Sequence, residues 1–484
     1  DVIGRVAGRC GSELCRYRRA ALKRSFARST ISGKAGRSGR PRTTEATARG
    51  RPDAVMTEPS RYEGPGSALD HRARAVPRSD RRDRSSGGGE GADLTQLSAD
   101  RSASGVGLSE ADDPVRAALE AVERALAGRD LQAGDAVVLF SAGFRDPVGA
   151  FERAADAVSP ARLVACSSDG AFTAAATIAK GCCAAHLSSR GLRLGVARCD
   201  LGCELAGAAR AAAEQARAQA TAEGEGRHAA LVLLSDGLAG DQREIVRGAY
   251  EVTGAAVPIV GGAAGDDLRI SRTWQYADGA STNSVVALWI ESSEPIGVGV
   301  AHGWRPASAP MLVTRAEGNV IVELEGRPAR DAYLETRNRP LPDGQPFATF
   351  AMDHPLGIPN ARGRYDVRHV LDATDGGLAM FAYVPESTVV QVMEASAEEL
   401  LEGAEEAARQ ARGELAGPAA TVLAFSCAAR KPILGDAVVE EPRRIASACA
   451  TSRLCGFFTY GEFGRVTGST GFHNASVAVL ALSA

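Results

Sequence analysis

Glycine-rich segments that precede an acidic residue are the first candidates for chemistry in this sequence. Gly261, Gly262 and Gly265 follow an apolar run and lie directly before Asp266. Glycines permit a sharp turn at the end of a strand and leave backbone N–H groups free to bind an anion. The spacing does not fit a dinucleotide-binding loop, which opens a helix with G-x-G-x-x-G. We expect an anion-binding turn, with a tight turn that holds no ligand as the alternative.

A second candidate is the segment that contains His302, Trp304 and Arg305. These side chains offer an imidazole, an aromatic wall and a fixed cation, a combination suited to a ligand site. His473 is the counterpart of His302 in the C-terminal part of the chain. A histidine that hydrogen-bonds within the core is the alternative for both positions.

A thiol and several charges complete the set of candidate residues. Cys427 follows an apolar run and precedes Arg430 by three residues. A guanidinium nearby would lower the pKa of the thiol, and we expect a structural or redox-sensitive thiol rather than a catalytic one. Glu462 follows Gly461 as Asp266 follows Gly265.

These charges suggest how an amino acid would be held. Asp266 and Glu462 would accept hydrogen bonds from an ammonium group, while Arg430 or Arg315 would bind a carboxylate through two hydrogen bonds. The alternative is that the same acidic and basic side chains pair with one another.

The elements that must position these residues repeat three times along the chain. Each copy contains an alanine-rich helix, a buried strand, a second helix, a second strand and a hairpin, and the first helices are predicted at 111–127, 203–222 and 397–411. This order predicts an α/β fold in which mixed β-sheets are flanked by helices, built from a duplicated unit. If the units face each other, their strand ends converge on one cleft, formed by segments 261–266, 302–305, 426–430 and 461–462.

Composition separates the first hundred residues from the rest. The 484-residue chain has a net charge of −3, yet residues 1–107 hold 22 Lys and Arg against 12 Asp and Glu. A segment so rich in Arg, Ser and Gly cannot bury enough apolar surface to fold, so we expect a disordered basic tail. It carries no nucleic-acid-binding motif. Residues 2–44 have the composition of an organellar transit peptide, which is the alternative to a cytoplasmic location.

The cysteines and the apolar runs exclude several other classes. None of the ten cysteines lies in a C-x-x-C pair, so we expect reduced thiols and neither a metal site nor a disulfide framework. No apolar run approaches the roughly 18 residues of a membrane-spanning helix. We expect a soluble, intracellular protein without membrane insertion or a specific nucleic-acid partner.

Several motifs resemble those of a known family. The sequences PIVGGAAGD at 258–266, GVAHGWRP at 299–306 and ELEGRPA at 323–329 resemble the N-terminal FIST domain. The sequences HPLG at 354–357, FSCAAR at 425–430, GFFTYGE at 456–462 and FHN at 472–474 resemble the C-terminal FIST domain. We expect an N-terminal FIST-like domain at 108–340 and a C-terminal one at 341–484, divided at the turn-rich 340–344.

The resemblance implies a sensory or signal-transduction module. It implies a small ligand, an amino acid or similar, bound in a cleft between the two FIST domains, together with a signalling protein partner. On this interpretation the protein is not an enzyme and needs no cofactor. The alternatives are a haem-based nitric oxide or redox sensor with His302 as the iron ligand, a thiol-dependent enzyme acting through Cys427, and a ubiquitin-ligase-type substrate adaptor without a small ligand.

Overall fold

The computed structural model describes residues 105–483, apart from 203, 223, 225, 337–345, 361–362 and 466–470. Most of the predicted tail and the predicted boundary at 340–344 therefore lie outside the described residues. The first strand, β1, spans Gly105–Ser109. The described fold thus includes residues 105–107, which the sequence assigned to the tail.

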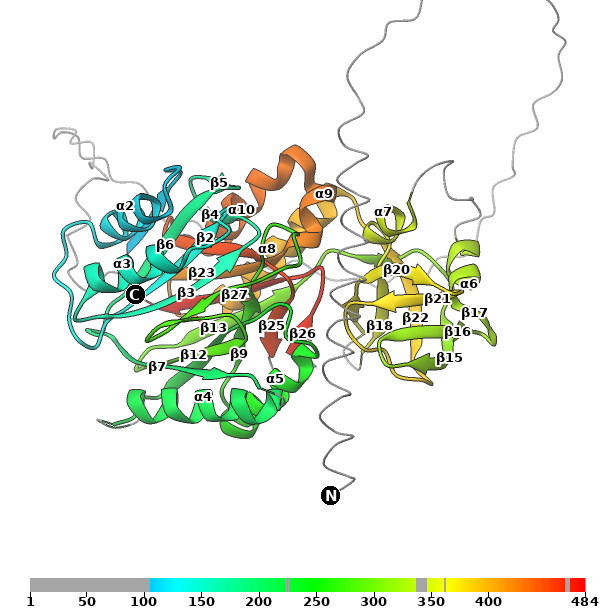
Figure 1. Cartoon of the computed structure of the whole chain (residues 1–484), viewed down its shortest axis with the longest axis horizontal. Coiled ribbons are helices and arrows are strands. Elements are labelled where there is room, and N and C mark those ends of the chain that lie inside the picture. Colours follow the sequence, from blue (N-terminus) through cyan, green and yellow to red (C-terminus); the bar gives the residue numbers. More distant parts are fainter. Residues whose placement is uncertain are drawn as a thin grey trace, which may run out of the picture. The chain divides into compact units, whose positions relative to one another are not determined.

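Three units follow one another with the same order of elements, as the sequence predicted (Figure 1). The first contains β1, α2 (Pro114–Leu126), β2 (Ala136–Ala142), α3 (Val148–Val158), β3 (Arg162–Ser168), the hairpin β4–β5 (Ala171–Thr173 and Thr177–Ile178) and β6 (Gly181–Leu187). The second contains β7 (Leu192–Asp200), α4 (Leu205–Ala220), β8 (His228–Ser235), α5 (Gln242–Thr253), β9 (Ile259–Ala263), the hairpin β10–β11 (Gln275–Tyr276 and Ala280–Ser281) and β12 (Ser284–Ser292).

The third unit repeats this order around a large insertion. It contains β13 (Ile296–Ala301), α8 (Ala397–Gly413), β23 (Ala419–Cys427), α10 (Glu440–Ala448), β24 (Leu454–Thr459), β25 (Glu462–Arg465), β26 (Gly471–His473) and β27 (Val477–Ser483). Three short helical turns, η1 (Ala428–Arg430), α9 (Lys431–Leu434) and η2 (Gly435–Val439), connect β23 to α10. Because β13 pairs with β27, a strand that precedes the predicted boundary belongs to the same sheet as the C-terminal strands.

Each unit forms a six-stranded mixed sheet that is completed by a hairpin from another unit. In the first sheet, β1, β6, β2 and β3 are followed by β10 and β11 of the second unit. In the second sheet, β7, β12, β8 and β9 are followed by β25 and β26 of the third unit. In the third sheet, β13, β27, β23 and β24 are followed by β4 and β5 of the first unit. The hairpins are therefore exchanged in a closed cycle.

The alanine-rich helices approach their sheets closely because the facing strands carry glycine. A Cβ atom on Gly297 or Gly299 of β13 would lie about 2 Å from the backbone oxygens of Ala411 and Ala407 in α8. Small residues on both sides let the helix and strand backbones approach each other. The apolar face that α8 buries against the sheet is correspondingly made mainly of alanine.

The insertion lies between β13 and α8 and forms a separate sheet with two short helices (yellow and light green in Figure 1). Its elements are β14 (Arg305–Pro306), β15 (Met311–Glu317), β16 (Val320–Leu324), β17 (Arg327–Pro328), α6 (Ala329–Glu335), α7 (Phe347–Met352), β18 (Leu356–Pro359), β19 (Tyr365–Arg368), β20 (Val370–Thr374), β21 (Gly377–Met380) and β22 (Val389–Glu394). A core of its own surrounds the buried Tyr333.

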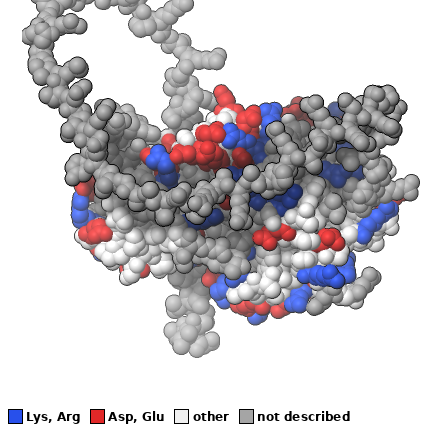
Figure 2. All heavy atoms as spheres, turned by 180° about the vertical axis from the view of Figure 1, so that it is seen from behind, with Lys and Arg blue, Asp and Glu red and all other residues white. Residues whose placement is uncertain are grey.

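Charged side chains of both signs are interspersed on the face shown in Figure 2. Many charged side chains of the described residues form ion pairs one helical turn apart, such as Arg409 with Glu405 and Glu406. Exposed pairs of this kind contribute at most about 1 kcal/mol each. Among the helices of the described residues, none is long and apolar enough to cross a membrane.

Candidate functional site

The four predicted segments do converge, through direct hydrogen bonds. Strands β25 and β9 pair with Glu462 opposite Gly262, and the Ala263 N–H donates to the Gly461 carbonyl at 2.8 Å. The Arg430 guanidinium donates to the His302 carbonyl at 2.8 Å. The first two contacts join the third unit to the second, and the last lies within the third unit, between η1 and the residue after β13. They form a packed polar junction, so space for a ligand lies beside the junction rather than within it.

The glycines serve packing and not anion binding. Gly261 has a φ of 141°, and a Cβ atom there would lie 2.0 Å from the Leu233 carbonyl of β8. A Cβ atom on Gly262 would meet the side chain of Thr459, and one on Gly265 would meet Asp169. The backbone N–H groups of Ala263, Ala264 and Gly265 are not free to bind an anion, because each donates to a backbone carbonyl. The predicted turn with free N–H donors is therefore wrong.

Asp266 organises the loop that follows it. Its carboxylate accepts hydrogen bonds from the N–H groups of Ile270, Ser271 and Arg272 at 2.7–2.9 Å. The Tyr460 hydroxyl donates to the same carboxylate at 2.7 Å and accepts from the Leu268 N–H. Because these donors already occupy the Asp266 carboxylate, this side chain holds the loop against the third unit.

Arg430 is fully buried and pairs with another buried charge. Its guanidinium lies 3.2 Å from Glu441 and also donates to the Leu400 carbonyl at 2.8 Å. The Ser426 hydroxyl donates to the same carboxylate, 2.9 Å from Oε1 and 3.1 Å from Oε2. The donors of Arg430 are therefore directed at protein groups, and the pairing of charges with one another is the alternative that the structure supports here.

Both histidines of the predicted site hydrogen-bond within the protein. His302 Nδ1 accepts from the Trp304 N–H at 2.9 Å, so Nε2 carries the proton and donates to the Tyr365 carbonyl at 3.0 Å. Burial lowers the pKa of His302 to about 4. His473 Nε2 lies 3.0 Å from the Gly464 carbonyl, and burial lowers its pKa as well. A haem iron at His302 would have to displace one of these two partners.

The remaining predicted residues lie at the edge of the site or away from it. The buried Trp304 donates its indole N–H to the Ala475 carbonyl at 2.8 Å. Arg305 is exposed and pairs with Glu394 and Glu399. Arg315 lies on β15 of the insertion, within 3.3 Å of Glu323. Its ion-pair partners, Glu317 and Glu323, both belong to the insertion and not to the junction.

Two hollows adjoin the junction. The larger holds about 1580 Å³ of space between atoms, open solvent included, and is bordered by His302, Trp304, Arg305 and His473. The charged groups along it pair with one another, as Arg305 does with Glu399. The smaller, which we call the Cys427 pocket, holds about 490 Å³ on the same measure and is constricted inside.

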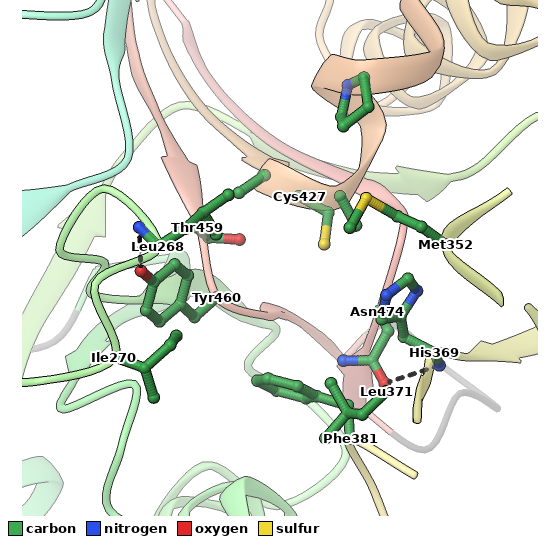
Figure 3. A pocket seen from close by; sticks show the side chains of 13 residues that line it. Leu268, Ile270, Met352, His369, Leu371, Phe381, Cys427, Thr459, Tyr460 and Asn474 are labelled. Atoms are coloured by element: carbon green, nitrogen blue, oxygen red, sulfur yellow. Dashed lines mark hydrogen bonds between the residues drawn. The ribbon is translucent and has the colours of Figure 1, made fainter. Parts of the chain in front are cut away.

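The Cys427 pocket draws its lining from three parts of the chain (Figure 3). The second unit contributes the loop after β9, and the insertion contributes α7 and the strands β20 and β21 with their flanks. The third unit contributes the ends of β23 and β24, the helical turns η1 and α9, and the turn after β26. The lining residues are Leu268, Ile270, Met352, His369, Leu371, Phe381, Cys427, Ala428, Ala429, Pro432, Thr459, Tyr460 and Asn474. Most of this surface is apolar, so the few polar groups in it are conspicuous.

Cys427 is the most reactive type of group in the pocket, but its pKa is not lowered as the sequence suggested. Burial is the main cause that raises the pKa of the thiol well above its ordinary value, and the nearby Glu462 carboxylate adds to the effect. Backbone N–H groups of Ala429 and Ala475 interact with the sulfur and oppose this shift. Arg430 has no part in activating the thiol, because it points to Glu441.

Glu462 is a fully buried carboxyl group behind Cys427. It accepts hydrogen bonds from the Thr459 hydroxyl and from the N–H and hydroxyl of Ser476. Burial raises its pKa to about 7, while these donors and the Cys427 thiol work in the opposite direction. At neutral pH this carboxyl can therefore either accept or release a proton.

His369 belongs to the site and was missed from the sequence. It follows β19 in the insertion, is 6% exposed, and has a pKa lowered to about 4 by burial. Its Nδ1 has no hydrogen-bond partner within the described part of the chain. Figure 3 shows the ring beside the pocket near Met352, while the Cys427 sulfur points into the same space. No local motif marks His369, so only the tertiary structure identifies it.

Comparison with known proteins adds the following findings. The FIST N domain model matches residues 135–327 and the FIST C domain model matches residues 329–465. An uncharacterized protein of Mycobacterium tuberculosis is 27% identical over 230 residues, which is 46% of this chain and 60% of the relative. An uncharacterized protein of Methanocaldococcus jannaschii is 28% identical over 121 residues, 22% of this chain and 24% of the relative. The chain thus spans about 60% or less of the length of these curated relatives.

Among solved structures, the cyanuric acid hydrolase of A. caulinodans aligns with 79% of this chain and 99% of its own. The TM-score is 0.31 and the sequence identity is 12%. A likeness this distant bears on neither the fold nor the function.

Proposed function

Because the chain belongs to the FIST family and carries its N and C domains in order, we propose that it is a sensory module whose small ligand occupies the Cys427 pocket. One observation carries this proposal: the lining of the pocket comes from the second unit, the third unit and the insertion. A ligand there contacts all three parts at once. Its binding free energy can therefore bias their arrangement and, through it, contact with a signalling partner.

The chemistry of the pocket favours a small neutral ligand over an amino acid. Apolar and aromatic side chains such as Phe381, Leu371 and Ile270 make up most of the lining. The charged groups that would anchor a zwitterion are already paired, since Arg430 binds Glu441 and Asp266 binds its own loop. We expect a mainly apolar molecule with one or two hydrogen-bonding groups.

The test is to block the pocket without disturbing the fold. Ala429 is half-buried and lines the pocket, so Ala429→Phe should fill it. Ala437, also half-buried but outside the lining, provides the matched control Ala437→Phe. Ligand-observed NMR with a library of small neutral compounds should give binders that the wild-type chain and the control share and that Ala429→Phe loses.

Two results of this experiment would contradict the proposal. One is that every compound bound by the wild-type chain also binds to Ala429→Phe with unchanged affinity. The other is that charged amino acids bind and are lost in Arg305→Ala, which would move the site to the larger hollow. Thermal unfolding of each variant shows whether it is folded.

A further inference from the structure

The Cys427 pocket contains a nucleophile with a proton acceptor directly behind it. Cys427 ends β23 and lies opposite Thr459 of β24 in the parallel ladder. Its thiol interacts with the Glu462 carboxyl, which the hydroxyls of Thr459 and Ser476 hold in place. Glu462 is not among the residues that line the pocket, whereas the Cys427 sulfur points into it (Figure 3).

A second, independent observation points to a ligand at this position. His369 is more than nine-tenths buried and contributes its ring to the pocket lining. Its Nδ1 has no hydrogen-bond partner within the described residues. A buried polar atom without a partner destabilises the folded state, a cost that a polar ligand atom hydrogen-bonded to Nδ1 would remove.

We propose that Cys427 is a covalent attachment site for a small, apolar α,β-unsaturated carbonyl compound, with Glu462 as the proton acceptor and His369 as the hydrogen-bond partner of the ligand carbonyl. This inference rests on the proposed function, because the ligand occupies the same pocket. It adds the chemical class of the ligand and the bond that holds it.

The proposed reaction is an addition that needs no oxidant or other reactant. The Cys427 sulfur forms a bond to the β-carbon of the ligand, and the carbon–carbon π bond breaks to give an enolate. The thiol proton passes to the Glu462 carboxylate, and a proton then returns to the α-carbon of the ligand. The enolate oxygen is stabilised by a hydrogen bond from His369, in the tautomer that carries the proton on Nδ1. Every atom of both reactants remains in the product.

The environment of the thiol explains why the reaction would be selective. Burial keeps the thiol protonated in the empty pocket, so it is a poor nucleophile towards molecules in solution. A ligand that fits the pocket is held against the sulfur while Glu462 removes the proton. Within the described residues, Glu462 interacts with the Thr459 hydroxyl, the Ser476 hydroxyl and N–H, and the Cys427 thiol. His473 lies opposite Glu462 in the β25–β26 ladder.

The test uses cyclohex-2-enone as the probe and the full chain as the reactant. Peptide mapping by mass spectrometry measures the rate of adduct formation at Cys427. We expect this rate to exceed by at least tenfold the rate at the same residue in the urea-unfolded chain. The rate of adduct formation should also rise with pH through about 7, where Glu462 ionises. Glu462→Gln should lower this rate at least tenfold and abolish its rise near pH 7. His369→Phe should slow the reaction, and Cys449→Ser, which alters a buried thiol outside the pocket, should leave it unchanged.

Each outcome supports or overturns the inference. Modification of Cys427 no faster than in unfolded chain, or an unchanged rate in Glu462→Gln, overturns it. If Glu462→Gln fails to fold, the pH profile of the wild-type chain decides, because a rate without a step near pH 7 excludes Glu462 as the acceptor. Saturated cyclohexanone, which cannot undergo the addition, separates the two proposals. If cyclohexanone binds reversibly to the wild-type chain and not to Ala429→Phe, while cyclohex-2-enone forms no adduct at Cys427, the ligand pocket stands and the covalent inference fails.

Discussion

Removal of the Arg430 side chain should destabilise the whole fold. Arg430→Ala leaves the Glu441 carboxylate buried, with Ser426 as its one remaining side-chain donor among the described residues, and it removes the donors to the His302 and Leu400 carbonyls. Breaking a buried ion pair by removing one partner costs about 3–5 kcal/mol, since the remaining charge stays uncompensated. We expect a loss of about 4 kcal/mol in the free energy of unfolding.

Urea denaturation followed by tryptophan fluorescence measures this loss. With a denaturant slope of about 3 kcal/mol per molar, the midpoint should fall by roughly 1–1.5 M. The double variant Arg430→Met/Glu441→Leu removes both charges and should recover at least half of the loss, because two apolar side chains replace the pair. A midpoint within 0.2 M of wild type for Arg430→Ala, a margin of about 1 kcal/mol or less, would refute this account. A double variant no more stable than the single one would show that the carbonyl contacts, not the charge pair, dominate.

Three further predictions concern the residues around the junction. Gly261→Ala should cost roughly 3 kcal/mol, because its Cβ atom would collide with a backbone oxygen of β8, whereas Gly149→Ala, with open space around its Cβ position, should be neutral or stabilising in urea denaturation. The raised pKa of Glu462 means that the folded state holds this proton more tightly. Its stabilising contribution is present below about pH 4.5 and is lost as pH rises to about 7. This pH-dependent change in the free energy of unfolding amounts to about 3 kcal/mol, and it should be absent when Glu462→Gln is unfolded at the same pH values. Asp266→Asn should lose about 2 kcal/mol and speed amide hydrogen exchange in residues 270–272, and unchanged exchange there would contradict its role in the loop.

The repeat architecture could be predicted from the sequence because it depends on local patterns. Alanine at helical spacing and apolar runs that end in glycine specify the same order of elements three times. The exchange of hairpins could not be predicted in this way. Strands of two or three residues carry almost no signal, and the pairing of β4 with β24 joins segments about 280 residues apart, a separation that local periodicity does not encode.

The candidate site was predicted in part, for a related reason. Sequence position placed Cys427 and Glu462 at strand ends, and the structure brings them together. Residue type alone did not reveal that Arg430 is paired, because its partner Glu441 lies on a different helix. His369 comes from the insertion, which enters the site only through tertiary packing. Side-chain chemistry gives the candidates, while partners distant in the sequence decide which groups stay available.

The cyclic exchange of hairpins also delays completion of the sheets while the chain is being synthesised. The hairpin β4–β5 leaves the ribosome early, but β24, on which it docks, follows about 280 residues later. At 5–20 residues per second, that interval lasts roughly 15–60 s. Throughout it the hairpin β4–β5 has no sheet to join, and for the first part of it β3 also lacks its partner β10. Unpaired strand edges of this kind attract other chains. We expect the nascent chain to need protection until the last unit is made, so its yield in cells should depend on chaperone supply more steeply than the stability of the finished fold would suggest.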